Sequence, residues 1–370
     1  VSATGSDNEQ ITSINQKFSD PTRNTVRNNA ASNNLNANLT GSVLLYNGMR
    51  VVAAKSRLAQ LQAQSEKLLN SQVQNTIAAV MTSYYDVVRQ QNYIRTIDQS
   101  ISAAQQKLEI VKKQQAVGLA NNADLFQAQL DLNNLLQAKQ SQQLVIDQAK
   151  ATLLTVMTAR PDSVINISDT IVVANGIQLQ AVLDKLSSNA DIMAAGDQIK
   201  INEQLVKETG ALRYPSLRGS AGYSFARSKN AAGFSLLNQS YGPTVGVSVT
   251  IPIYNGSIYK RQQQVAEINV KSAEIQQQLL LRDYSNGVVK TFQAYQSNLQ
   301  QLQTAKENHL LAQQLLSLVL QRFQLRQATI LEVNQAQQSF ETASYTLTNL
   351  SYAAKAAEIE LNRITNQLKF

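Results

Sequence analysis

A repeat without gaps restricts the fold of this chain more than any other feature. Tyr46-Asn47-Gly48 recurs as Tyr254-Asn255-Gly256, 208 residues later, and the same offset continues to about residue 157 without an insertion. The matched pairs include Val80 with Val288, Tyr84 with Phe292, Leu108 with Leu316 and Leu153 with Leu361. Loops of free length would have collected insertions. The constant lengths therefore predict two rods that end at the same two levels.

A seven-residue spacing of apolar residues predicts that these rods are helices packed side by side. The positions are Val73, Val80, Val87, Ile94, Ile101 and Leu108 in the first copy, and Leu281, Val288, Tyr295, Leu302, His309 and Leu316 in the second. The first helix is expected over 49–117, a rod of about 100 Å, and its return helix over 123–158. The second copy turns near 325–329 and returns to the C-terminus. His309, the one histidine, is interpreted as a packed or hydrogen-bonded seam residue and not as a ligand.

The segment between the copies is expected to hold a short strand and a further helix. Arg160-Pro161 ends the first return helix, 164–173 has the composition of a strand, and a helix is predicted over about 179–211.

Before each Tyr-Asn-Gly the pattern changes to a period of two. Five apolar residues share one face of the second such segment, and the opposite face is small or polar; the apolar residues are Val245, Val247, Val249, Ile251 and Ile253. Strands of about ten residues with this pattern are typical of a membrane barrel wall. The alternative is a sheet that packs on its own helices. The helix seams already pack against each other, and Tyr46 and Tyr254 end equivalent strands where an interfacial aromatic girdle would lie, so we favour the barrel.

Asn-Gly usually marks a β-hairpin, but here a helix follows. Asn47 can cap that helix and Gly48 can adopt the required backbone angles. We therefore interpret Tyr-Asn-Gly as a strand-to-helix junction in both copies, with a hairpin as the alternative. One chain supplies three or four strands, the first poorly defined, with a surface loop over about 20–34. Because the smallest barrels need about eight strands, several chains must contribute.

Composition excludes several classes of function. There is no Cys and one His, so thiolate chemistry and a His-based metal site or triad are not expected. The net charge of +8 comes from scattered residues, which argues against nucleic-acid binding. No catalytic group and no cofactor site is evident.

The chain resembles the TolC-like outer membrane efflux proteins. The resemblance rests on the duplication, the strands ending in aromatic-Asn-Gly, Tyr214-Pro215-Ser216-Leu217, and a tip pattern. That pattern is Val117-Gly118-Leu119 followed by Asp124-Leu125-Phe126-Gln127-Ala128-Gln129, with Glu332-Val333-Asn334-Gln335-Ala336 in the second copy. The resemblance implies a mainly α fold with a transmembrane β-barrel portion. A homotrimer would share a twelve-stranded barrel in outer membrane lipid, and long antiparallel coiled-coil helices would form a tunnel through the periplasm. It also implies two partners, a periplasmic adaptor (membrane fusion protein) and an inner-membrane transporter.

This resemblance divides the chain into six parts. They are 1–48 (first strand pair and surface loop), 49–158 (first helical hairpin), 159–178 (equatorial connection), 179–212 (helix leading to the barrel), 213–256 (second strand pair) and 257–370 (second helical hairpin). The family places a helix before its first strand, and none is evident here, so the chain is expected to be N-terminally incomplete.

The turns at the helix tips are the candidate functional site. By the resemblance, Asp124 and its counterpart Glu332 would form a constriction, with Arg322 and Arg326 helping to hold it shut. The alternative is that all four are solvated surface charges. Gly118, Leu119 and Leu325 would contact the adaptor, although Arg326 replaces the glycine expected in the second tip.

The function predicted from these features is an exit duct of a tripartite efflux pump or type I secretion system. A soluble coiled-coil scaffold or periplasmic adaptor is the alternative, and an enzyme is not expected. Nothing in the sequence selects a substrate.

Overall fold

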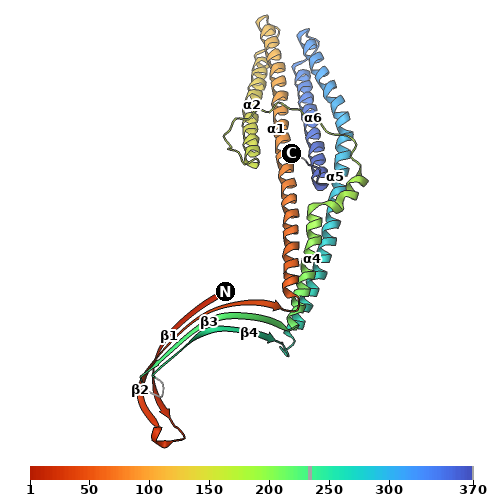
Figure 1. Ribbon diagram of the computed structural model, residues 1–370. Coiled ribbons are helices and arrows are strands. Elements are labelled where there is room, and N and C mark those ends of the chain that lie inside the picture. Colours follow the sequence, from red (N-terminus) through yellow and green to blue (C-terminus); the bar gives the residue numbers. More distant parts are fainter. Residues whose placement is uncertain (232–235, 369–370) are drawn as a thin grey trace. The chain divides into compact units, whose positions relative to one another are not determined.

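The computed structural model describes residues 1–231 and 236–368, and it confirms the predicted rods of equal length (Figure 1). The chain divides into two units. Helices α1 (Arg50–Ala116) and α5 (Ile258–Gln324) each have 67 residues, and helices α2 (Asn122–Val156) and α6 (Ile330–Ile364) each have 35. Every one of these boundaries repeats at the offset of 208. We predicted that the second return helix continues to the C-terminus, but α6 ends at Ile364. This position is equivalent to the end of α2.

The first unit comprises Val1–Gln62 and Gln198–Ala273 and contains a four-stranded antiparallel sheet in the order β1-β2-β3-β4. The strands are β1 (Ser2–Gln16), β2 (Thr25–Tyr46), β3 (Ser216–Asn230) and β4 (Leu237–Thr250). Three features differ from prediction: β1 is a full strand of 15 residues, 25–34 belongs to β2 and not to a loop, and strands reach 22 residues. Residues 1–34 are rich in Asn and Ser and show no clear alternation of apolar and polar residues, so no strand was predicted there. In the structure, the hydrogen-bonded ladder between β1 and β2 satisfies the backbone N–H and C=O groups of this segment.

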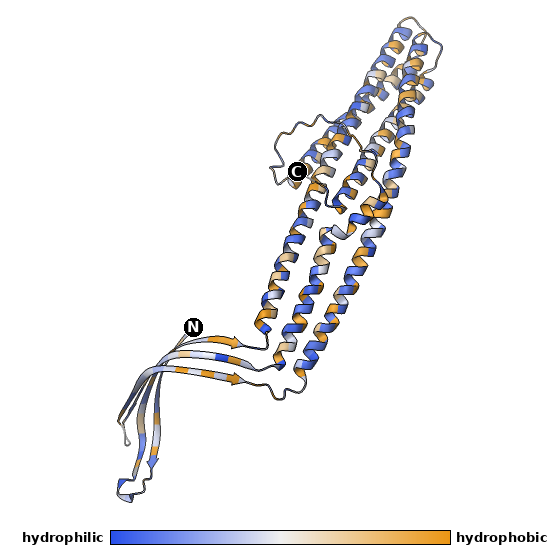
Figure 2. Ribbon diagram, turned by 45° about the vertical axis from the view of Figure 1, so that its right-hand side comes forward, coloured by the Kyte–Doolittle hydropathy of each residue, from blue (hydrophilic) through white to orange (hydrophobic). Residues whose placement is uncertain are grey.

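The strand register gathers the apolar residues on one face of the sheet. Val247 lies opposite Gly219, and Val249 lies opposite Leu217. Directly paired residues share a face, so the predicted apolar face of β4 continues across β3. Figure 2 shows the resulting alternation of orange and pale segments along the strands. The β4 side chains Val245, Val247 and Val249 are all exposed.

Three helical segments complete the first unit: the start of α1, the end of α4 (Ala190–Gly210) and the start of α5. Arg57 of α1 donates to Glu208 of α4 at 2.9 Å, and Asn202 of α4 donates to the Asn269 carbonyl of α5 at 3.2 Å. Polar contacts between side chains and backbone thus hold α4 between the two long helices at this level.

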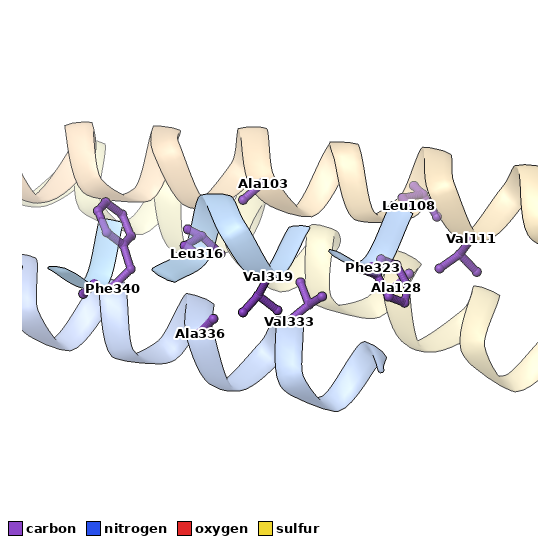
Figure 3. Packing of buried hydrophobic residues seen from close by; sticks show 11 residues of the cluster. Ala103, Leu108, Val111, Ala128, Leu316, Val319, Phe323, Val333, Ala336 and Phe340 are labelled. Carbon is purple, nitrogen blue, oxygen red and sulfur yellow. The ribbon is translucent and has the colours of Figure 1, made fainter. Parts of the chain in front are cut away.

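The second unit comprises Ala63–Asp197 and Glu274–Phe370 and holds two helical hairpins, α1 with α2 and α5 with α6. Its largest core lies between the four helices, and Figure 3 shows side chains from all four pointing inward. Val111 of α1, Val319 of α5 and Val333 of α6 are buried there. The predicted seven-residue seam supplies Leu108 and Leu316 to this core.

His309 is a hydrogen-bonded seam residue, as predicted. Its Nδ1 lies 3.0 Å from the Ser344 hydroxyl, and its ring lies 5.6 Å from that of Phe340. These contacts join α5 to α6.

The connection between the copies differs from prediction. Residues 164–173 form no strand, and the predicted helix over 179–211 is broken into α3 (Leu179–Asp184), a 3-10 turn (Lys185–Ser188) and α4. The break falls at Asn189. Its side chain accepts from the Asp191 N–H at 3.0 Å and donates to the Ile364 carbonyl at 2.8 Å. One side chain therefore caps α4 and binds the end of α6, which a continuous helix would not allow.

Candidate functional site

The first tip turn, between α1 and α2, ends one helix and caps the next. Gly118 has φ +75°, its N–H donates to Gln115 O at 2.9 Å, and the Leu119 N–H donates to Gln114 O at 2.8 Å. This is the Schellman arrangement that satisfies the last carbonyls of a helix. The Asn121 side chain then caps α2 by accepting from the Asp124 N–H at 2.8 Å.

The second tip turn, between α5 and α6, repeats this geometry with different residues. Arg326 stands at the position of Gly118 with φ +62°, and its N–H donates to Phe323 O at 3.1 Å. Thr329 caps α6 and exchanges hydrogen bonds with Glu332 in a capping box. A non-glycine residue in the left-handed region costs about 1–2 kcal/mol of conformational free energy. The second turn therefore has the same backbone shape as the first, although Arg326 makes that shape less favourable locally.

The four predicted gate charges are placed at these turns but are not paired with one another. Asp124 and Glu332 lie in the first turns of α2 and α6. Arg322 donates to the Gln327 carbonyl at 2.8 Å. In the described part of the chain, none of these residues forms an ion pair with another of the set.

The two tip acids differ in their surroundings. The Thr329 backbone N–H, followed by its hydroxyl and more weakly by Arg322, lowers the pKa of the Glu332 carboxyl. The Glu332 carboxylate therefore accepts hydrogen bonds from Thr329 at the N-terminus of its own helix. At the first tip, Asn121 accepts from the Asp124 N–H, and within residues 1–231 and 236–368 no capping-box bond is formed by the Asp124 carboxylate.

Apolar side chains at the same turns face outward. Leu119 and Leu325 are both more than half exposed, and no atom lies within 4 Å of a Cβ added at Gly118. The predicted adaptor-contact residues therefore form an accessible surface on each hairpin end.

The two Tyr-Asn-Gly segments differ in how a strand precedes them. Strand β2 ends at Tyr46 as predicted, whereas β4 ends at Thr250, so the prediction that Tyr254 ends an equivalent strand is wrong. Gly48 and Met49 both have positive φ, as do Gly256 and Ser257. The Arg50 N–H donates to Asn47 O at 3.3 Å, which closes a tight turn whose two central residues, Gly48 and Met49, both have positive φ. The chain leaves this turn as a helix, and the Asn47 side chain accepts from the Val51 N–H at 3.3 Å.

The two junction glycines have different neighbours. A Cβ on Gly48 would lie 2.6 Å from Tyr214 Cβ and 2.9 Å from the Ala211 carbonyl oxygen, whereas a Cβ on Gly256 would contact nothing within 4 Å. The Tyr46 side chain is about half exposed and that of Tyr254 almost fully exposed. At the first junction, Gly48 therefore packs closely against the segment that leads into β3.

A buried charge cluster in the second unit was not predicted from the sequence. Lys107 of α1 is fully buried, and its Nζ donates to Asp131 Oδ2 of α2 and to Asn334 Oδ1 of α6, both at 2.6 Å. Lys107 precedes the seam residue Leu108, and its counterpart in the second copy is Leu315. The difference between the two copies at this position, a lysine in the first and a leucine in the second, is the sequence feature that could have indicated this cluster.

Two further observations concern membrane-spanning helices and metal ligands. Within residues 1–231 and 236–368, no helix is both long and apolar enough to cross a membrane. The same residues contain no cluster of three or more potential metal ligands.

The family profile described as "Outer membrane efflux protein" matches residues 1–159 and 182–367. The chain therefore belongs to the outer membrane efflux protein family, and it is an outer membrane protein that extends into the periplasm.

One curated protein and several solved structures are similar to this chain. An uncharacterized protein of Haemophilus influenzae is 22% identical over 233 residues, which cover 61% of this chain and 50% of the relative. The chain thus matches about half the length of that curated relative. The outer membrane protein VceC from Vibrio cholerae shares the fold, with TM-score 0.77 and 18% identity over 99% of this chain and 86% of VceC. The CmeC outer membrane channel of Campylobacter jejuni matches with TM-score 0.68 and 14% identity over 100% of this chain and 79% of CmeC.

Proposed function

We propose that this protein is the exit duct of a tripartite efflux pump or type I secretion system. In this proposal three copies assemble, and each contributes its four strands to one twelve-stranded barrel. The helical hairpins form a periplasmic tunnel that ends at the tip turns. A passive duct needs no catalytic group and no cofactor.

The observation that carries the proposal is the sheet, taken together with the family. Within the described residues, β1 and β4 each pair with one neighbouring strand, and the valines of β4 are exposed. An open sheet edge is not tolerated in lipid, and four strands are too few for a barrel. Copies of the same chain can supply the missing edges while lipid covers the apolar face.

Mass and conductance test this proposal. The detergent-solubilised protein is expected to have the mass of three copies by light scattering and to form ion-conducting channels in a planar bilayer. A monomer that keeps its strand content, or a trimer that never conducts, would contradict it.

We also propose that Asp124 of three copies forms a cation-attracting constriction and that Arg326 or Arg322 helps to keep it closed. Carboxylates brought into a ring repel unless cations or arginines neutralise them, and the Asp124 carboxylate is not used for capping. Glu332 would add to the ring less than Asp124, because its carboxylate bonds Thr329.

Single-channel recording separates this gate from ordinary surface charge. Asp124→Ala is expected to weaken cation preference or block by divalent ions, and Arg326→Ala to raise conductance. Arg282→Ala is the control, because Arg282 is an exposed arginine on α5 about 66 Å from Arg326 at 1.5 Å per residue. Parent-like behaviour of both tip variants would show that the constriction lies elsewhere.

The partners proposed are a periplasmic adaptor and an inner-membrane transporter, with the adaptor at Gly118, Leu119 and Leu325. Exposed leucines at a turn fit an apolar docking surface. A photoreactive label on Leu119→Cys is expected to join a polypeptide other than this protein in intact cells. The same label on Leu69→Cys, which is exposed on α1 far from the tip, should not.

A further inference from the structure

The apolar face of the sheet ends at a pair of aromatic residues. On β3 the residues of this face are Leu217, Gly219, Ala221, Tyr223 and Phe225. Tyr241 of β4 lies directly opposite Phe225. From Leu217 to Phe225 the strand covers about 27 Å, or roughly 21 Å of height at a tilt of about 40°. This is close to the apolar band of a membrane barrel, which is about 25 Å tall and ends in aromatic girdles.

Two basic residues follow on the same face of β3. Arg227 and Lys229 continue the alternation beyond Phe225, and both side chains are exposed. Arg227 lies about 7 Å beyond the aromatic pair at 3.4 Å per residue. Because β3 follows the helices at Ser216, and the helices extend into the periplasm, the end of β3 at Asn230 is its outer end. The two cations therefore lie at the level of the outer headgroups.

A polar groove lies beside Lys229. It has a volume of about 290 Å³, and Glu9 of β1, Asn33 of β2 and Lys229 of β3 line it. The strand register places these three residues in one row across the sheet. Further polar lining comes from Gln10, Ser32 and Asn230. The groove therefore offers amide and hydroxyl groups next to a cation.

A third cation lies at this groove. The exposed Arg27 donates from Nη1 to the carbonyl of Ala231, which lines the groove, at 3.3 Å. Among residues 1–231 and 236–368, no ion pair joins Arg27, Arg227 or Lys229 to an acid. The positive charge of this cluster is therefore not neutralised by the described part of the chain.

The acids of the same face lie on the far side of β2. Asp7 shares a row with Arg227, and Glu9 shares a row with Lys229. Two strand spacings, about 10 Å, separate each acid from the base in its row. The Asp7 carboxylate accepts from the Asn33 side chain at 2.9 Å. The face is therefore basic over β3 and acidic over β1, which directs an anion to β3.

We infer that Arg227, Lys229 and Arg27 bind the phosphorylated sugar headgroup of a glycolipid in the outer leaflet. Its phosphate accepts charge-assisted hydrogen bonds from the basic side chains, and its sugar hydroxyls bind in the polar groove beside Lys229. Its acyl chains lie along the apolar face below. The inference rests on the proposed barrel, to which it adds a lipid site.

The apolar face that adjoins the cations favours a lipid over a soluble anion. Ion pairs formed by exposed side chains alone contribute little, because water and salt screen them. Tyr223 and Val245, on the apolar face, are 50% and 85% exposed. Acyl chains that cover such side chains add apolar burial to the charge attraction, and a free phosphate adds none.

Native mass spectrometry of the detergent-solubilised trimer, with diphosphorylated lipid A as the probe, tests the site. Arg227→Gln/Lys229→Gln is expected to weaken lipid A binding by at least about tenfold, because both cations near the phosphates are lost. Arg218→Gln is the matched control. Arg218 is exposed on the same strand, but it lies on the opposite face near the periplasmic end, so binding should stay within about twofold of the parent.

Two further measurements identify the ligand chemistry. Lipid A from which both phosphates have been removed should bind the parent at least about tenfold more weakly. Lys229→Arg keeps the charge and should bind lipid A as the parent does. Inorganic phosphate in large excess should not displace the bound lipid A, because it lacks the acyl chains.

The outcomes separate this inference from the proposed function. A conducting trimer that binds lipid A equally well without Arg227 and Lys229, or that binds the dephosphorylated lipid equally well, overturns the inference and leaves the duct standing. Displacement by inorganic phosphate overturns it in favour of a soluble-anion site. Absence of any trimer overturns the barrel on which both depend. Loss of binding in the double variant, with unchanged conductance and a parent-like Arg218→Gln, supports the inference.

Discussion

Removing one partner of the Lys107 cluster is expected to destabilise the second unit far more than removing an exposed ion pair between the same two helices. Lys107 is fully buried, and its pair with Asp131 measures 2.6 Å. Asp98 of α1 and Lys139 of α2 form a second pair at 2.7 Å, but these side chains are 47% and 46% exposed. The two pairs share residue types, helices and distance, and they differ in burial.

The expected magnitudes follow from burial. Asp131→Ala leaves a buried ammonium with Asn334 as its remaining acceptor, and loss of one partner of a buried pair costs roughly 3–5 kcal/mol. Because Asp131 is 20% exposed and water can enter after truncation, we expect the lower end, about 3 kcal/mol. Asp98→Ala is expected to change the unfolding free energy by less than about 0.5 kcal/mol. Both substitutions make the same Asp-to-Ala change on a helix.

Thermal unfolding of the detergent-solubilised protein, followed by circular dichroism, measures the difference. A loss of about 3 kcal/mol corresponds to a Tm lower by roughly 6–12 °C for a unit of this size, whereas Asp98→Ala should stay within about 2 °C. Lys107→Met keeps the buried stem and removes the charge. In the Asp131→Ala background it should recover most of the lost Tm, because no uncompensated charge remains.

Two results would refute this reasoning. Equal Tm changes for Asp131→Ala and Asp98→Ala would mean that burial does not strengthen the pair. Failure of Lys107→Met to recover the Asp131→Ala variant would mean that the loss comes from packing and not from a stranded charge.

Three further outcomes are expected. Gly48→Ala should abolish folding of the first junction or lower the Tm strongly, whereas Gly256→Ala should lower it mildly, because only at Gly48 does an added Cβ meet backbone and side-chain atoms. Arg326→Gly should raise stability to urea by about 1 kcal/mol, since it removes a side chain from the left-handed region, and an unchanged urea midpoint would contradict this. Val247→Arg should destabilise the barrel in the outer membrane by about 2–4 kcal/mol, because it places a charge on the face that meets lipid. Thr250→Arg, on the opposite face, should be tolerated. Equal recovery of the two variants as folded protein in heat-modifiability gels would show that the apolar face does not meet lipid.

The helical rods could be predicted because the same helix lengths occur in both copies of the repeat. Each boundary of α1 and α2 recurs in α5 and α6 at the same offset, so an error in one copy would have been visible in the other. The seven-residue spacing correctly indicated that Leu108 and Leu316 face inward. It was wrong for Leu281, which occupies a seam position and is exposed.

The strand at the N-terminus could not be predicted from alternation, because its side chains are polar on both faces. Asn8 lies opposite Asn34, and Asp7 opposite Leu35, in a ladder held by the backbone. The same limit applies to 164–173, where β-branched residues suggested a strand. Ile167 and Ile171 instead pack on the helices of the second unit, so tertiary contact and not strand pairing satisfies this segment.

The break at Asn189 and the cluster at Lys107 have a common cause. Each depends on a partner far away in sequence, the Ile364 carbonyl for Asn189 and Asn334 for Lys107. Periodicity describes one helix at a time and cannot supply such partners.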